Sequence, residues 1–271
     1  IYPQNASDPF RLLGPVWAED LDGDKHVDLI MASAGTAADS GALTAYFNDG
    51  TGKFTASKTV SIGADIRDVA AVKVRTGSLR DIVATACHTP NFGGTKYSRC
   101  NLVVVQQLTA RNFTNVLTSS MFFDGSESNG QHAFLTVGDF NLDGVTDVAA
   151  VTNASMTPFQ SMGTSGTGSM LKLYDGTTLT RDSFRYGNGK TLSGPAVAIS
   201  SGRLVSTPAA QLDLVITQFA PGGTGLVEVY QNPGNGRFDQ ATPSQLTTVG
   251  RPGKIATGDF DSDGRTDFAV T

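Results

Sequence analysis

One feature constrains the fold of this 271-residue chain more than any other: an aspartate followed by a short apolar run occurs five times at similar intervals. The aspartates are Asp28, Asp81, Asp147, Asp213 and Asp267, and successive members stand 53, 66, 66 and 54 residues apart. Such a repeat indicates that one small structural unit is used several times, and that each copy buries its apolar face against its neighbours.

Each copy is predicted to contain four short strands. One apolar run precedes the aspartate, a second follows it, and the first four copies continue with a third run, LTAYF, LVVVQ, MLKLY or LVEVY, and then a more polar segment. Gly and Asn in the turns Asn48–Phe54 and Asn232–Phe238 can supply the positive φ angles that tight hairpins need. This pattern predicts an all-β fold, a β-propeller of four-stranded antiparallel blades with an incomplete fifth blade.

We expect a single propeller domain over residues 1–271. The repeats span approximately residues 14–63, 64–119, 131–187, 194–249 and 250–271, and residues 1–13 are a candidate for a ring-closing strand. Because the fifth repeat is short, either the ring has five blades with one thin blade or the chain is part of a larger propeller. The chain begins at Ile1 without a methionine or a signal segment, which indicates a processed mature chain or a fragment.

Composition argues against several other classes of protein. Gly accounts for 31 residues and only 17% of residues are charged, which suits short strands joined by turns better than a helical bundle. The net charge of −5 is mild and Lys and Arg do not cluster, so nucleic acid is not expected as a partner. No apolar run approaches the roughly 18 residues needed to cross a bilayer, so membrane insertion is not expected either.

Three repeats carry an acidic loop directly before the repeated aspartate. The loops are DLDGDKHVD at Asp20–Asp28 (loop 1), DFNLDGVTD at Asp139–Asp147 (loop 3) and DFDSDGRTD at Asp259–Asp267 (loop 5). Each loop places a side-chain oxygen at positions 1, 3, 5 and 9, and position 7 would add its backbone carbonyl. Ca²⁺ takes about six to eight oxygen ligands, so the sequence predicts about three Ca²⁺ sites. The predicted ligands are Asp20, Asp22, Asp24, His26 and Asp28 in loop 1; Asp139, Asn141, Asp143, Val145 and Asp147 in loop 3; and Asp259, Asp261, Asp263, Arg265 and Asp267 in loop 5.

The alternative interpretation is that Asp and Gly are simply common in exposed turns, but three copies at the same place in a repeat favour metal binding. EF-hands are excluded, because position 12 is Met31, Ala150 or Val270 in an apolar strand rather than Glu. Glycine permits a sharp turn at position 6 of loops 3 and 5, where loop 1 has Lys25. Loop 1 is therefore expected to be the weakest or the most distorted site.

The pattern GDF-x-x-DG-x-x-D, followed by a short apolar strand, resembles the FG-GAP or VCBS repeat of integrin α-chain propellers and related bacterial and fungal proteins. The resemblance is specific in repeats 1, 3 and 5, and covers nearly the whole chain once the degenerate repeats 2 and 4 are included. Those two repeats keep only Asp81 and Asp213, to which no metal is assigned. The resemblance implies mainly structural metal sites that pin the hairpin between the first two strands of a blade.

Cys87 and Cys100 flank a polar segment that is expected to be a loop between two apolar runs. A disulfide closing this loop is predicted and would indicate an oxidising compartment, with two buried free thiols as the alternative. Sequons at Asn5, Asn112 and Asn153 would permit N-glycosylation. These features predict a secreted or cell-surface protein.

Catalytic sequence motifs such as GxSxG, HExxH, a P-loop or a dinucleotide fingerprint do not occur. His26, His88 and His132 are scattered and not expected to catalyse, and Trp17 is predicted to pack in the core. We therefore expect an adhesion or recognition module for protein or glycan more than an enzyme. The alternatives are a carbohydrate-active enzyme, either a polysaccharide lyase or a glycosidase, and a structural segment of a larger surface protein or filament.

The connections between the second and third strands vary most among the repeats. They are SAGTAADSGA, HTPNFGGTKYSR, NASMTPFQSMGTSGTGS and APGGTG, and they include the aromatic residues Phe92, Tyr97 and Phe159. Repeat scaffolds tend to concentrate insertions on their binding face. The protein or glycan ligand is therefore expected on the face opposite the acidic loops.

Overall fold

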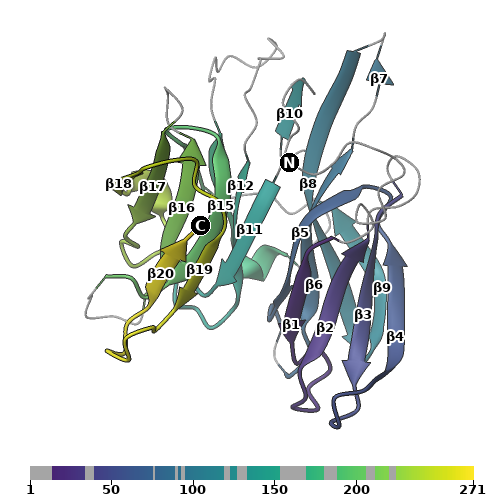
Figure 1. Ribbon diagram of the computed structural model, residues 1–271. Helices are drawn as coiled ribbons and strands as arrows, with labels where there is room; N and C mark the ends of the chain where they lie inside the picture. Colours follow the sequence, from purple (N-terminus) through teal and green to yellow (C-terminus); the bar gives the residue numbers. More distant parts are fainter. Residues whose placement is uncertain are drawn as a thin grey trace. The chain divides into compact units, whose positions relative to one another are not determined.

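The computed structural model describes residues 14–33, 40–75, 77–88, 91–92, 95–118, 123–126, 133–152, 169–179, 188–205, 211–219 and 224–271. These residues form strands, together with the short 3₁₀ turns Gly176–Thr178 and Phe238–Gln240 (Figure 1). The prediction of an all-β fold built of four-stranded antiparallel sheets is confirmed. The candidate strand at residues 1–13 and the sequons at Asn5 and Asn153 lie outside the described residues.

The sheets correspond to the repeats predicted from the sequence, except that the predicted end of repeat 3 at residue 187 is wrong, since its fourth strand, Asn188–Thr191, lies beyond it. The strands of each repeat pair in chain order. Repeats 1 and 2 contain the strands β1 (Val16–Glu19), β2 (Asp28–Ser33), β3 (Ala42–Asn48) and β4 (Phe54–Ser61), and β5 (Asp65–Val72), β6 (Asp81–His88), β8 (Thr95–Thr109) and β9 (Asn112–Thr118); in repeat 2, β7 (Asn91–Phe92) and β10 (Phe123–Ser126) also pair with β8. Repeats 3 and 4 contain β11 (Ala133–Gly138), β12 (Asp147–Thr152), β13 (Met170–Tyr174) and β14 (Asn188–Thr191), and β15 (Ala196–Gly202), β16 (Asp213–Phe219), β17 (Gly225–Tyr230) and β18 (Ser244–Thr248). Repeat 5 contains β19 (Ile255–Gly258) and β20 (Asp267–Val270). Among the described residues of the fifth repeat, only these two strands form its sheet.

The five repeated aspartates are the first residues of β2, β6, β12, β16 and β20. Burial alternates along β2, whereas β6 and β16 are buried almost throughout. Such near-continuous burial explains why the apolar runs DIVATA and DLVITQ carry so few polar residues, since a strand covered on both faces has no solvent-facing side. Within the described part of the chain, no helix has the length and apolar character needed to cross a membrane.

The contacts divide the chain into two compact units. The N-terminal unit comprises Ile1–Glu127 with Leu179–Phe184, and the C-terminal unit comprises Ser128–Thr178 with Arg185–Thr271. The N-terminal unit holds the sheets of repeats 1 and 2 around one apolar core, against which Trp17 packs as predicted. The C-terminal unit holds repeats 3, 4 and 5, and its core includes the edge-to-face pair Phe140 and Phe238.

Within each unit, the first strands of consecutive repeats lie next to each other. In the N-terminal unit β5 contacts β1, and in the C-terminal unit β15 contacts both β11 and β19. The connection between the first and second strands of a repeat, which is the acidic loop in repeats 1, 3 and 5, therefore recurs at the same end of its sheet. The connection from the second strand to the third is at the opposite end, because the strands are antiparallel.

The predicted disulfide between Cys87 and Cys100 is present, with the two residues directly opposite each other on β6 and β8. The prediction that the segment between them is simply a loop is wrong. The strand β6 continues to His88, β8 begins at Thr95, and the short strand β7 pairs with the start of β8. Threonine and tyrosine favour strands, so the hairpin extends beyond the apolar runs that mark it in the sequence.

Candidate metal centres

The three acidic loops share one backbone conformation, with left-handed residues at positions 4 and 6. The φ angles are 84° and 72° at Gly23 and Lys25, 62° and 84° at Leu142 and Gly144, and 64° and 82° at Ser262 and Gly264. Lys25 therefore adopts the conformation that glycine adopts in the other two loops, so the distortion expected of loop 1 is not seen at this position. A side chain in this region costs roughly 1–2 kcal/mol, because Cβ approaches the following carbonyl oxygen.

Side chains at positions 3 and 5 of each loop accept hydrogen bonds from the loop backbone. In loop 3 the Asp143 amide donates to Asn141 Oδ1 at 3.0 Å, and the Val145 amide donates to Asp143 Oδ1 at 2.8 Å. Loops 1 and 5 contain the same two bonds, at 3.1 and 2.9 Å and at 3.0 and 2.8 Å. These bonds hold alternate carboxylates on the inner side of a tight turn.

The aspartate at position 1 closes each loop by accepting two backbone hydrogen bonds. Asp139 accepts from Asp143 at 3.1 Å and from Gly144 at 2.9 Å, and Asp259 is bonded in the same way. Asp20 instead accepts from Gly23 at 2.8 Å and from Lys25 at 3.0 Å. In loop 1 the donor of one of these two bonds is therefore the residue at position 4, whereas in the other two loops it is the residue at position 5.

Two of the loops bring three carboxylates together. In loop 1, Asp20, Asp22 and Asp24 each offer one oxygen within 4.8 Å of the others, and in loop 5 Asp259, Asp261 and Asp267 do so. Loop 3, which has Asn141 at position 3, forms no such group among the described residues. Clustered carboxylate oxygens are the donor set that Ca²⁺ prefers, and they repel one another without a cation. The residues of loops 1 and 5 therefore fit a hard divalent cation.

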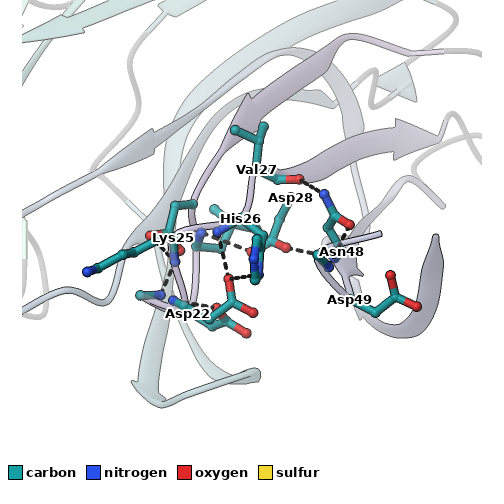
Figure 2. Close-up of polar contacts among 12 residues, drawn as sticks. Asp22, Lys25, His26, Val27, Asp28, Asn48 and Asp49 are labelled. Carbon is teal, nitrogen blue, oxygen red and sulfur yellow. Dashed lines mark hydrogen bonds and ion pairs between the residues drawn. The ribbon is translucent and has the colours of Figure 1, made fainter. Parts of the chain in front are cut away.

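The aspartate at position 9 has a role that the sequence analysis missed. Both carboxylate oxygens of the buried Asp28 accept backbone hydrogen bonds, from Leu21 at 3.0 Å and from Asn48 at 2.9 Å. Figure 2 shows Asp28 reaching the start of the hairpin that follows β3. Asp147 accepts in the same way from Phe140 at 3.0 Å and from Gly176 at 2.8 Å.

Repeats 2 and 4, which lack acidic loops, retain this arrangement. Asp213 accepts from Leu204 at 3.1 Å, from Val205 at 2.9 Å and from Asn232 at 2.8 Å, and Asp81 accepts from Gln107 at 2.8 Å. In repeats 1 to 4 the repeated aspartate therefore fastens the start of the second strand to the end of the third strand or to the turn that follows it, with or without metal ligands nearby. In the sequence, the clue to this role is that the aspartate recurs in repeats 2 and 4, which have no acidic loop.

Burial raises the pKa of three of the repeated aspartates. Desolvation, with smaller contributions from the charges of Asp143 and Asp175, raises the pKa of Asp147 to about 6, against the opposing effect of its two backbone hydrogen bonds. Burial likewise raises the pKa of Asp28 and of Asp81. A positive charge close to these groups would favour their ionised forms.

Arginine side chains provide such charges at Asp81 and at other carboxylates of loops 1 and 5. Arg111, from the turn between β8 and β9, donates its Nε–H to Asp22 at 2.5 Å, and its Nη2 lies 3.3 Å from Asp24 Oδ2. Arg265 donates to Asp263 of its own loop at 2.8 Å, and Arg75 pairs with Asp81. The contact of Arg111 spans 89 residues, so sequence spacing gave no indication of it.

Two side-chain amides connect an acidic loop to the next repeat. Gln107 donates from Nε2 to the carbonyl of Leu21 at 2.7 Å, where Leu21 is position 2 of loop 1. Asn232 donates from Nδ2 to the carbonyl of Phe140, position 2 of loop 3, at 2.8 Å. Leu21 and Phe140 are both fully buried. The amide of the later repeat thus caps the loop of the earlier one.

Most of the predicted recognition loops lie outside the described residues, including residues 34–39, 153–168 and 220–223. Phe159 and His132 are among the residues not described. Phe92 and Tyr97 lie in β7 and β8, and His88 is the last residue of β6. The predicted ligand-binding face is therefore not tested.

Comparison with known proteins agrees with the repeat pattern. The FG-GAP-like repeat family matches residues 20–75 and 211–270, which contain loop 1 and loop 5. No curated protein sequence matches the chain. Among solved structures, a rhamnogalacturonan lyase, YesW, is similar with a TM-score of 0.37 and 10% sequence identity, over 93% of this chain and 57% of the lyase chain.

Proposed function

On the premise that this chain is built of FG-GAP-like repeats, we propose that it is an extracellular propeller module, stabilised by Ca²⁺ in its acidic loops, that binds a protein or glycan ligand. The observation that supports the metal is the convergence of three carboxylates within 4.8 Å in loop 1 and again in loop 5. The disulfide supports an oxidising location outside the cytosol.

The proposed role of the metal is structural. Each acidic loop joins the first and second strands of its sheet, and in loops 1 and 3 the position-9 aspartate is already bonded to backbone outside the loop. Bound Ca²⁺ would neutralise the crowded carboxylates, and Asp20, Asp22 and Asp24 would hold it in loop 1. The loop backbone keeps these groups facing inward, and once Ca²⁺ is bound they would have few free lone pairs for a ligand.

The proposed recognition surface is the opposite end of the sheets. Connections there differ in length and composition, whereas the acidic loops keep nearly the same residues in three repeats. Variable loops on a rigid repeat scaffold are where binding specificity is usually placed. A ligand bound at this end would be separated from the metal by the length of a strand.

Metal binding is tested by thermal unfolding with and without EDTA, together with metal analysis. A ligand at a hundred times its Kd adds about 2.7 kcal/mol per site, so chelation should lower the melting temperature clearly. Asp263→Ala should remove one ion and leave the others. An unchanged melting temperature together with a protein free of calcium would contradict the proposal.

Recognition is tested by screening glycan and matrix-protein arrays and then replacing Thr157–Gly168, in the connection after β12, with a short Gly/Ser linker. We expect the replacement to weaken ligand binding and to leave the calcium-dependent melting temperature nearly unchanged, since surface loops tolerate replacement. If binding survives the replacement but is lost in a calcium-site variant of normal stability, the ligand contacts the metal loops instead.

A further inference from the structure

Arg111 occupies a position that is glycine in the corresponding hairpins of two other repeats. The hairpins that follow β3, β8 and β17 begin with Asn48, Gln107 and Asn232, and each reaches a phenylalanine six residues later. Their fifth residues are all left-handed, with φ of 84° at Gly52, 63° at Arg111 and 69° at Gly236.

The three turns are also closed by the same hydrogen bond. The amide of the fifth residue donates to the side-chain oxygen of the first, at 3.1 Å for Gly52, 2.6 Å for Arg111 and 3.2 Å for Gly236. The backbone is thus alike at the fifth residue of all three hairpins, although the third residue is left-handed in two of them, at Gly50 and Gly234, and not at Thr109. Repeat 2 differs in placing a long cationic side chain where glycine would avoid strain.

The guanidinium group of Arg111 lies against the metal-ligand carboxylates of loop 1. It bonds Asp22 and Asp24 as described above, and it sits 5.0 Å from the centre of the Phe47 ring. The side chain of Asp22 is only 4% exposed, so this carboxylate has almost no access to water. Two of the three carboxylates that converge in loop 1 are therefore already paired with a cation.

We propose that Arg111 is a built-in counter-ion of loop 1, which holds this loop folded without calcium and lowers its affinity for calcium. The proposal rests on the proposed calcium binding by the acidic loops. Because a guanidinium group does not lose its proton in proteins, the positive charge is permanent. Loop 3 has no equivalent at this position, since the corresponding residue is Gly236, which has no side chain.

The electrostatics favour this assignment. A metal ion entering loop 1 must approach a fixed positive charge and share the oxygens of Asp22 and Asp24 with it. In the dielectric of bulk water, which gives the weakest interaction, the repulsion between Ca²⁺ and a guanidinium group about 5 Å away corresponds to roughly a tenfold loss of affinity. Conversely, without metal the same charge removes the repulsion that would otherwise open the loop.

Trp17 makes the test specific to loop 1. It is the only tryptophan of the chain, it lies on β1 directly before loop 1, and it packs against the N-terminal core. Calcium titrations followed by its fluorescence should report loop 1 alone. Arg111→Gly, which restores the residue of the other hairpins, should lower the calcium midpoint about tenfold, whereas Arg111→Lys should stay close to the wild type.

The reverse substitution is the matched control. Gly236→Arg places a guanidinium group beside loop 3, where a Cβ at this position would meet Phe140 atoms at an ordinary 3.5 Å. This variant should bind one calcium ion more weakly by calorimetry, with an unchanged Trp17 titration. A midpoint for Arg111→Gly that equals or exceeds that of the wild type would overturn the claim that Arg111 weakens the site.

A second measurement in EDTA separates the counter-ion from the calcium proposal. Asp22→Asn should lower the melting temperature in the wild type, because it breaks the pair with Arg111. In the Arg111→Gly background it should raise the melting temperature, because it only relieves repulsion. If Asp22→Asn shifts the melting temperature in the same direction in both backgrounds, the counter-ion role of Arg111 is refuted. If the shifts are opposite but the protein binds no calcium, only the proposed calcium binding is refuted.

Discussion

Lys25 offers a direct test of strain in the acidic loops. Its φ of 72° is in the region that glycine occupies at the same position of loops 3 and 5. Lys25→Gly should raise the free energy of unfolding by about 0.5–1 kcal/mol, the relief of strain less the added flexibility of the unfolded chain. Urea denaturation in EDTA measures this. Lys25→Ala keeps Cβ and should give no gain, so an equal gain for both would show that strain is not the cause.

A second residue-scale feature is Lys172 on β13, whose side chain is almost completely buried. Desolvation lowers the pKa of its ammonium group from 10.5 to about 8. The folded protein therefore binds fewer protons here than the unfolded chain between pH 8 and pH 10.5. Stability from this group should rise with pH across that window, because the cost of burying the charge disappears as the proton leaves.

We expect Lys172→Met to raise the free energy of unfolding at pH 7 by on the order of 2 kcal/mol, and this difference from the wild type to shrink above about pH 10. Urea denaturation at both pH values measures the effect. The exposed Lys53 provides the matched control, since Lys53→Met should change stability little at either pH. A loss of stability on Lys172→Met at pH 7 would show that the ammonium group is better compensated than its burial suggests.

At the scale of elements, the repeated aspartate is expected to stabilise each sheet independently of metal. Asp213 begins β16 in a repeat without an acidic loop and accepts three backbone hydrogen bonds. Asp213→Ala should cost about 2–3 kcal/mol, by leaving the buried N–H of Asn232 and the partly buried N–H groups of Leu204 and Val205 without their acceptor. The loss should be equal in calcium and in EDTA, whereas Asp147→Ala should cost more in calcium. A calcium-dependent loss for Asp213→Ala would place a metal in repeat 4.

The sequence pattern predicted the elements well, because an aspartate followed by an apolar run marks the second strand of every repeat. It also identified the acidic loops, whose ligands are adjacent in the chain. It missed the contacts of Arg111 and Gln107 with loop 1, since these come from a strand connection more than 80 residues away and need the packing of two sheets. The extension of β8 to Thr95 was missed because polar strand residues resemble a loop in sequence.

At the scale of the whole molecule, the disulfide should matter mainly to the N-terminal unit, in which it joins β6 to β8. Closing a loop of this size stabilises by about 3 kcal/mol, chiefly through the unfolded chain. Reduction should therefore lower the temperature at which Trp17 fluorescence reports unfolding. The double variant Cys87→Ser, Cys100→Ser should behave like the reduced protein. An unchanged transition after complete reduction would show that packing alone fixes the two strands.

The side-chain amides of Gln107 and Asn232 both bind loops that precede them in the sequence and are therefore synthesised earlier. The residue that donates a hydrogen bond to the carbonyl of Leu21 is synthesised 86 positions later, and the one that donates to the carbonyl of Phe140 is synthesised 92 positions later. At about 5–20 residues per second, each loop stays uncapped for roughly 4–18 seconds during synthesis. A nascent chain therefore exposes the apolar side chains of these loops until the following blade emerges, and this interval is when chaperones or early disulfide formation would protect it.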